Sequence, residues 1–410
     1  MNPPLRLSVF CPHFAPDVAP TGEVMTRIVL ELAARGHELH VVTALPWYQH
    51  HRVEEGWTGK LVRREVTEWG SITRIHPFPG PDTRSIPRRA LGFAGFCALA
   101  LLRGTRGPRV DGVLSMSPPL TLGLTGWLVH LKRRGPLVFN IQDVFPDAAR
   151  ETGAITNAHV LRIAAWLERA SYERSAAVTV LSDDLRENVA AKVSPGRRDR
   201  VRVIPNFVDT DAIRPGDRMT PYRAELGLGD EPVVMYAGNV GFSQSLDLML
   251  AAAKEMPEVQ FVVNGGGSAR LQLMDEASSL PNVHFGQFQP KARLSEVLAT
   301  GDVHVVPLRT GLARVSVPSK TYSILAAGRP VLAAIDPGTE VPRIIERSGA
   351  GVAVPPDDPT SFVDALRGLL ADPDGLAEMG AAGRRWVEGW ASPAAVAAAY
   401  EALFLELSSG

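Results

Sequence analysis

Short apolar segments alternate along the whole chain with longer segments of helical periodicity. In the first half, the apolar segments are residues 5–10, 38–44, 112–117, 136–142, 176–182 and 201–206. The segment between the first two has apolar residues at helical spacing and ends at Gly36, a residue type that commonly follows helix C-termini. Strands joined by helices are typical of parallel sheets with helices on both faces. The pattern therefore predicts a doubly wound α/β fold.

A polar, proline-containing stretch, residues 203–231, interrupts this pattern and indicates a linker with a short helix. The alternation then restarts with apolar segments at 232–238, 259–265, 283–288, 303–308, 330–335 and 350–355. Because 410 residues exceed the size at which single cores stop growing, about 250–300 residues, two domains are expected. We predict doubly wound domains at 1–205 and 206–390. Residues 391–410 are predicted to form a helix, capped by Ser392, that packs back on the first domain.

Composition excludes several classes of protein. The only cysteines are Cys11 and Cys97, and no C-x-x-C or H-E-x-x-H spacing occurs, which argues against a disulfide framework and against a zinc site. The N-terminus lacks the pattern of a signal peptide and instead reads as a first strand. We therefore expect a cytoplasmic protein with no metal and no other cofactor.

Charge is distributed unevenly. Residues 1–200 hold 26 Lys/Arg and 19 Asp/Glu, a net +7, whereas residues 201–410 hold 17 and 25, a net −8. The apolar run 90–102 is flanked by arginines and is shorter than the roughly 20 residues that span a bilayer. A buried core helix and interfacial docking on a membrane both fit this run. We expect the basic half to contact an anionic membrane surface, and we expect no nucleic-acid partner.

Doubly wound sheets bind ligands at the carboxyl ends of their strands. In the second half, Gly238, Asn239 and Gly241 follow a strand and precede a helix. Their backbone amides suit either a phosphate cradle or an ordinary tight turn.

Lys320 is the clearest candidate for binding an anion. It follows Pro318 and Ser319 at the predicted start of a small-residue helix, where a cation opposes the helix dipole. A hydroxyl, a cation and free amides at one helix start attract phosphate by charge and hydrogen bonding. We therefore favour a phosphate site over a surface lysine.

Two carboxylates stand out in the first half. Asp143 comes directly after a buried strand, where it fits either a group that orients or deprotonates a hydroxyl, or a turn residue. Asp17, in the first strand-to-helix loop near Gly22, has the same two interpretations, and we assign it to acceptor binding.

The chain resembles a known family through segments in a fixed order. These are "HFAPDVAPTGEVMTRIVLELAARGHELHVVTALPWY", "SPPLTLGLTG", "QDVFPDAARETG", "VIPNFVDTDAIRP", "YAGNVG" and "VPSKTYSILAAGRPVLA". Together they resemble the family 4 (group 1) glycosyltransferases of GT-B fold. Within that family, the chain looks most like the bacterial subgroup that includes the N-acetyl-L-fucosaminyltransferases of O-antigen and capsule synthesis.

The resemblance implies two Rossmann-like domains that face a central cleft, with a C-terminal helix crossing back to the first domain. It also implies a retaining, metal-independent transferase of the hexosyltransferase class. The nucleotide-sugar donor, a UDP-sugar, would bind the C-terminal domain and the acceptor the N-terminal one. Such an enzyme would act at the cytoplasmic face of the plasma membrane on a polyprenyl-diphosphate-linked saccharide.

The sequence departs from the family pattern at charged positions. Family members commonly have Arg and Lys after the glycine turn, where this chain has Asn239 and Gln244. They also have two glutamates spaced eight apart, where this chain has Val315 and Ser323. We infer that Lys320 takes over the role of neutralising the diphosphate and that Ser323 contacts the ribose.

Other roles are carried over from the resemblance. Gly22 and Gly241 would approach the donor phosphates from opposite sides. Gln287 would lie where the family holds the base through backbone groups, and Asp143 would orient or deprotonate the acceptor hydroxyl. Two other functions also fit this sequence: a UDP-sugar 2-epimerase, and a non-catalytic nucleotide-sugar-binding partner of another transferase.

Overall fold

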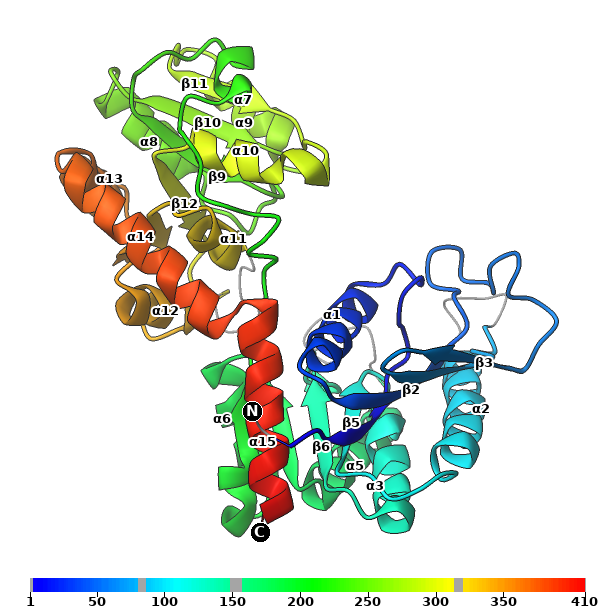
Figure 1. Ribbon diagram of the computed structural model, residues 1–410. Coiled ribbons are helices and arrows are strands. Elements are labelled where there is room, and N and C mark those ends of the chain that lie inside the picture. The colour runs from blue at the N-terminus through cyan, green and yellow to red at the C-terminus, as the bar shows by residue number, and fades with distance from the viewer. Residues whose placement is uncertain (1–2, 80–85, 148–156, 313–319, 410) are drawn as a thin grey trace. The chain divides into compact units, whose positions relative to one another are not determined.

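The computed structural model describes residues 3–79, 86–147, 157–312 and 320–409 of the chain (Figure 1). It divides into two compact units. The first contains Met1–Asn206 and Val396–Gly410, and the second contains Phe207–Ala395.

The described part of the first unit is built on an eight-stranded sheet with the order β3-β4-β2-β1-β5-β6-β7-β8. Neighbouring strands pair in parallel except β3 with β4. The elements are β1 (Arg6–Phe10), α1 (Pro20–Ala34), β2 (Glu38–Ala44), β3 (Val62–Thr67), β4 (Gly70–Ile75), α2 (Ile86–Gly104), β5 (Gly112–Ser117), α3 (Thr121–Arg133), β6 (Leu137–Ile141), α5 (Ala158–Arg174), β7 (Ala177–Val180), α6 (Asp183–Lys192), a 3₁₀ turn (Pro195–Arg200) and β8 (Val201–Val203).

The strands β3 and β4 are an antiparallel hairpin that the sequence analysis did not predict. Strand β3 lies at the edge of the sheet and has no fully buried side chain, so it lacks the apolar run that marks the other strands. Its partner β4 contributes Arg74, which is almost fully buried. The guanidinium of Arg74 donates hydrogen bonds to the carbonyl oxygens of Phe14 (3.4 Å) and Ala15 (2.6 Å). The hairpin thereby holds the loop between β1 and α1.

The last helix, α15 (Pro393–Ser409), contributes its residues from Val396 onward to the first unit. The Ser392 hydroxyl accepts a hydrogen bond from the amide of Ala395 at 3.1 Å, as expected for its predicted role as N-cap. Farther along, the Tyr400 hydroxyl accepts a hydrogen bond from the Asn140 side chain at 2.9 Å. Tyr400 and Asn140 are both buried, so the helix is part of the core of this unit.

In the second unit, the described residues form a six-stranded parallel sheet with the order β11-β10-β9-β12-β13-β14. The elements are α7 (Pro221–Glu225), β9 (Val233–Ala237), α8 (Asp247–Glu255), β10 (Gln260–Asn264), α9 (Arg270–Glu276), β11 (Val283–Gly286), a 3₁₀ turn (Lys291–Arg293), α10 (Leu294–Thr300), β12 (Val303–Pro307), α11 (Lys320–Ala326), β13 (Val331–Ala334), α12 (Glu340–Ser348), β14 (Gly351–Val354), α13 (Pro359–Leu370) and α14 (Pro373–Trp390).

Each sheet has a point at which the strand order reverses. The second unit runs outward from β9 to β10 and β11, then returns to place β12 on the other side of β9. In the first unit, the reversal lies between β1 and β5. Doubly wound sheets bind ligands outside the carboxyl ends of the strands at this reversal. Ligands are therefore expected at the loops after β9 and β12 in the second unit, and at those after β1 and β5 in the first.

Candidate active site

In the second unit, Lys320 and Tyr236 meet at the reversal point of the sheet. Tyr236 is a fully buried residue of β9, and Lys320 is the first residue of α11, the helix that follows β12. The ammonium nitrogen of Lys320 lies 3.9 Å from the centroid of the Tyr236 ring. The Tyr236 hydroxyl donates a hydrogen bond to the carbonyl oxygen of Asn239 at 2.5 Å. Tyr236 therefore contacts Lys320 through its ring and the glycine turn after β9 through its hydroxyl.

Lys320 is a cation that has no carboxylate partner among the described residues. Burial lowers the pKa of Lys320 to about 8. Within the described part of the chain, its ammonium makes no hydrogen bond and no ion pair, and the face of the Tyr236 ring is its one interaction. A ring face compensates only part of the lost hydration of an ammonium. An anion placed beside Lys320 would therefore be bound strongly and would raise the pKa of the ammonium again.

Glycines provide the space around this ammonium. A Cβ atom at Gly238 would lie 2.9 Å from Lys320 Nζ, and Gly238 has φ +150°. Gly265, after β10, has φ +139°, and its Cβ would lie 1.9 Å from the Gly238 carbonyl oxygen. Only glycine fits where the backbone has these φ values and passes this close to a neighbouring strand end. The two glycines are thus required for packing.

This packing gives a prediction for stability. Gly265→Ala should destabilise the second unit by more than about 2 kcal/mol, because the methyl group would overlap the Gly238 carbonyl at an unfavourable φ. Thermal denaturation should show a midpoint lower by about 5 °C or more for that unit.

Gly266→Ala is the matched control, since its Cβ would make an ordinary contact, 3.6 Å from the Phe288 ring, without a positive φ. Equal stability of the two variants would contradict the packing argument.

Three of the four backbone amides of the glycine turn, those of Gly238, Val240 and Gly241, already have partners. The amide of Gly238 donates to the Asn264 carbonyl oxygen (2.9 Å), and that of Val240 donates to the Gly266 carbonyl oxygen (2.8 Å). The amide of Gly241 donates instead to the side-chain oxygen of Gln244 at 2.9 Å. A side chain can rotate away, whereas a strand carbonyl cannot. A phosphate oxygen would therefore reach the Gly241 amide by displacing Gln244.

The other predicted donor contacts lie around the same strand ends. Asn239 and Gln287 are exposed, the first after β9 and the second after β11. Ser323 is half-buried and lies one turn beyond Lys320 on α11. Ser319, together with Val315, lies outside the described residues. The roles of these residues in donor binding stay predictions.

Two arginines at this edge are held by the protein itself. Arg309, after β12, pairs with Asp247 (2.8 Å) and Asp357 (2.9 Å). Arg270 donates to the carbonyl oxygens of Gly265 (2.6 Å) and Gly286 (2.8 Å). The charge of Arg309 is therefore compensated by two carboxylates. Arg270 has no carboxylate partner among the described residues, but its hydrogen bonds to the two carbonyl oxygens hold its guanidinium against the loops.

In the first unit, Asp17 and His13 form a pair in the loop after β1. The Asp17 carboxylate is buried and accepts a hydrogen bond from His13 Nδ1 at 2.6 Å. Its other oxygen accepts from the backbone amides of Trp47 (3.2 Å) and Tyr48 (3.0 Å). Three donors thus fix the carboxylate, and the carboxylate in turn orients the imidazole. Such a pair can hold a histidine ready to bind or accept a proton from a hydroxyl.

The His13 ring is also held by aromatic contacts. It stacks on Trp47 with ring centroids 5.6 Å apart and meets Tyr48 edge-on at 5.1 Å. Within the described residues, its Nε2 atom has no hydrogen-bond partner. His13 is not among the site residues predicted from the sequence, although its position four residues before Asp17 in the same strand-to-helix loop was an available signal.

Gly22 has a structural explanation within this loop. It lies in the first turn of α1, and a Cβ atom there would lie 2.8 Å from the Cβ of His13. A glycine at this position therefore lets the loop that bears His13 pack against the helix. The predicted contact of Gly22 with donor phosphates stays a prediction.

Asp143 lies in the loop after β6, at the carboxyl edge of the same sheet. Strand β5 separates β6 from β1, so Asp143 and the His13–Asp17 pair belong to loops two strands apart. The Asp143 side chain is exposed, and no described residue hydrogen-bonds its carboxylate. The structure thus fixes the His13–Asp17 pair but not Asp143.

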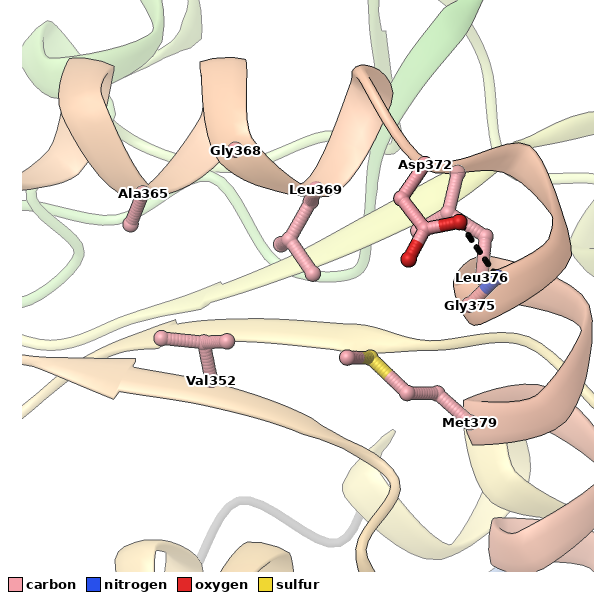
Figure 2. Close-up of a pocket in the computed structure, with 8 residues that line it drawn as sticks. All are labelled: Val352, Ala365, Gly368, Leu369, Asp372, Gly375, Leu376 and Met379. Carbon is pink, nitrogen blue, oxygen red and sulfur yellow. Dashed lines mark hydrogen bonds between the residues drawn. The ribbon is translucent and has the colours of Figure 1, made fainter.

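The pocket drawn in Figure 2 lies elsewhere in the second unit, between α13, α14 and Val352 of β14. It has a volume of about 290 Å³ and is lined mostly by apolar side chains. Its one carboxylate, Asp372, accepts a hydrogen bond from the amide of Gly375 at 2.9 Å and caps α14. With that carboxylate occupied, the pocket offers no group for catalysis.

Among the described residues, no three His, Cys, Asp or Glu side chains are grouped closely enough to hold a metal ion. The expectation that the protein works without a metal stays a prediction.

Comparisons with known proteins agree with this architecture. Residues 21–206 match the family "Glycosyl transferase 4-like domain", and residues 231–372 match "Glycosyl transferases group 1". A protein of Escherichia coli (strain K12), named as a colanic acid biosynthesis glycosyl transferase, WcaI, is 26% identical over 90% of this chain and 93% of its own.

Two solved structures are similar over nearly the whole chain. Sucrose-phosphate synthase from Thermosynechococcus elongatus superposes with a TM-score of 0.68 at 19% identity, over 99% of both chains. Anabaena Alr3699/HepE, solved in complex with UDP-glucose, has a TM-score of 0.61 at 15% identity, over 97% of this chain and 99% of its own. These similarities confirm the predicted fold class, two Rossmann-like α/β domains of GT-B type.

Proposed function

Because this chain is a nucleotide-sugar-dependent glycosyltransferase, with a glycosyl transferase 4-like domain followed by a group 1 domain, we propose that it uses a UDP-sugar. The acceptor is a lipid-linked saccharide at the inner face of the plasma membrane, and the product is part of a cell-surface polysaccharide. Transfer proceeds with retention at the anomeric carbon and without a metal ion.

The desolvated ammonium of Lys320 is the single observation that carries this proposal. Departure of a nucleoside diphosphate leaves about two negative charges that must be stabilised as the glycosidic bond breaks. Lys320 provides a cation without a carboxylate partner among the described residues, at the sheet reversal where such ligands bind. A preorganised cation in a water-poor site can do this work without a metal. Ser319, Ser323 and the turn from Gly238 to Gly241 complete the proposed donor site.

Two similarities support the donor and the pathway. Alr3699/HepE binds UDP-glucose on a fold like this one, which favours UDP as the nucleotide. The name of WcaI refers to colanic acid biosynthesis, which favours a role in making an extracellular polysaccharide. In this proposal, the backbone around Gln287 holds the uracil base.

We assign acceptor binding to the first unit. Asp143 is proposed to bind or deprotonate the acceptor hydroxyl, as the resemblance implies. The His13–Asp17 pair is a second group suited to that task, and it is the better ordered of the two because buried donors and rings fix it. Both lie at the carboxyl edge of the sheet.

A donor and acceptor screen tests the proposal. Purified protein is incubated with UDP-glucose, UDP-N-acetylglucosamine, UDP-N-acetyl-L-fucosamine and, for comparison, GDP-mannose, each with and without polyprenyl-diphosphate-linked saccharides. We expect UDP release only when both a UDP-sugar and an acceptor are present, and unchanged turnover in the presence of EDTA.

Each alternative gives a different result in the same screen. An epimerised UDP-sugar formed without acceptor indicates a 2-epimerase. Binding of UDP-sugar by folded protein, with no turnover on any acceptor, indicates a non-catalytic partner. Activity with GDP-mannose alone would overturn the choice of nucleotide.

A further inference from the structure

Three neighbouring helices of the first unit expose large apolar side chains. Helices α2 and α3 contact each other, and α3 contacts α5 (Figure 1). Their outward side chains include Leu91 (74% exposed), Leu102 (49%), Leu128 (39%), Leu131 (56%), Ile163 (62%) and Trp166 (63%). Single exposed apolar residues are common on protein surfaces, but contiguous ones mark interaction sites.

Helix α2 makes the pattern unusual. From Leu91 to Leu102, its only side chain with any polar character is the buried thiol of Cys97. The exposed positions are Leu91, Ala94, Ala98 and Leu102, spaced three or four apart, so they form one stripe along the helix. An outward helix face in a water-exposed position is ordinarily polar. This one is apolar for about three turns.

None of the helices among the described residues is long and apolar enough to cross a membrane. The stripe on α2 is twelve residues long, a length that suits a helix lying in the interface of a bilayer.

Basic residues accompany these helices. Residues 86–134 contain eight Lys/Arg and one acidic residue, a net +7, which equals the net charge of the first 200 residues. The described, exposed members are Arg103, Arg106, Arg109, Lys132 and Arg134, and none of them forms an ion pair with a described residue. Arg103 directly follows Leu102, and Lys132 directly follows Leu131. On α2 and α3, an exposed leucine is therefore followed by a basic residue that no carboxylate among the described residues neutralises.

We propose that the outward surface of α2, α3 and α5 docks on an anionic lipid bilayer. Apolar side chains enter the boundary between headgroups and acyl chains, while the arginines and lysines contact anionic headgroups, each contributing about 1 kcal/mol. The excess of positive charge favours an anionic bilayer over a protein partner, because the buried core of a protein interface is depleted in charged residues. The functional role of this docking rests on the proposed lipid-linked acceptor. Binding to vesicles can be measured whether or not that proposal holds.

Vesicle binding tests the proposal with the full chain. Cosedimentation is measured with phosphatidylcholine vesicles and with vesicles that contain roughly 30 mol% phosphatidylglycerol. We expect binding to the anionic vesicles only, weakened at least about tenfold in roughly 0.5 M NaCl. The double variant Leu91→Glu/Leu102→Glu, and separately Trp166→Ala, should each reduce binding about tenfold or more.

Leu271→Glu is the matched control, because Leu271 is 81% exposed on α9 of the second unit and lies outside the proposed surface. Equal binding by the control and the Leu91/Leu102 variant, or equal binding to neutral and anionic vesicles, would overturn the proposal. So would wild-type self-association that the same variant abolishes, since that would make the surface an interface between copies of this chain.

Activity assays separate this inference from the proposed function. The Leu91→Glu/Leu102→Glu variant should keep its turnover on a detergent-solubilised acceptor and lose it on acceptor embedded in vesicles. Vesicle binding without UDP release on any acceptor would contradict the proposed function and leave docking intact. UDP release with no vesicle binding would contradict docking and leave the proposed function intact.

Discussion

Replacing Lys320 by alanine is expected to lower kcat about 100- to 1,000-fold and to weaken UDP binding about tenfold. The loss follows because the ammonium sits in a desolvated position beside the Tyr236 ring, where charge on a departing diphosphate has no described carboxylate to compete with it. Steady-state kinetics and calorimetric titration with UDP measure the two effects. Lys254→Ala, which removes an exposed lysine of α8 in the same unit, should behave as wild type.

The pH dependence provides a second test of Lys320. Its pKa in the folded protein is about 8, below the ordinary value of 10.5, because burial disfavours the charged form. UDP affinity should therefore fall as pH rises through about 8, and binding above that pH should take up a proton. The Lys320→Ala variant should lack this fall.

Stability should change in the opposite direction from binding. Between about pH 8 and 10.5, the unfolded chain holds a proton on Lys320 that the folded protein has released, so the contribution of this residue to stability rises with pH. A parallel loss of binding and stability above pH 8 would point to unfolding instead. Full activity in Lys320→Ala would remove the basis of the proposed mechanism.

The second large effect is expected at His13. His13→Ala should lower kcat about 100-fold with little change in the KM for the donor, because its imidazole is the better ordered of the two groups suited to act on the acceptor hydroxyl. Asp143→Asn should have a smaller effect, about tenfold, since no described group orders its carboxylate. Kinetics with saturating donor and varied acceptor measure both.

Folding and chemistry at His13 can be told apart. The alanine variant leaves a space between Trp47 and Tyr48, so added imidazole should restore part of the activity. His50→Ala, an exposed histidine in the following loop, is the control and should be fully active. If Asp143→Asn proves the more damaging change, Asp143 is the group that acts on the acceptor, and the His13–Asp17 pair is structural.

Much of the fold could be predicted from the sequence because local spacing encodes it. Alternating apolar runs such as 232–238 and 303–308 mark buried parallel strands, and β9 and β12 lie there. Ser392 indicated the start of α15, because serine is a preferred residue at helix N-caps. The exposed hairpin strand β3 was missed, because a strand held by backbone pairing at a sheet edge needs no apolar pattern of its own.

Only part of the candidate site could be predicted from the sequence. Lys320 could be found because a cation at a helix start is anomalous within its own segment. Its partner Tyr236 could not, since nothing local distinguishes that tyrosine from any other core aromatic. His13 could not be found either, because its ring is held in place by Trp47 and Tyr48, which lie in the loop after the neighbouring strand β2.

By itself, then, the sequence determined the two doubly wound domains, the strand ends that carry the glycines, and the position of Lys320, because these depend on residues close together in the chain. Tertiary structure alone decided that the Lys320 ammonium is desolvated over a tyrosine ring, and that one apolar face of α2 is exposed while the other packs in the core. Desolvation and exposure are set by what packs around a residue, and those neighbours come from distant parts of the chain.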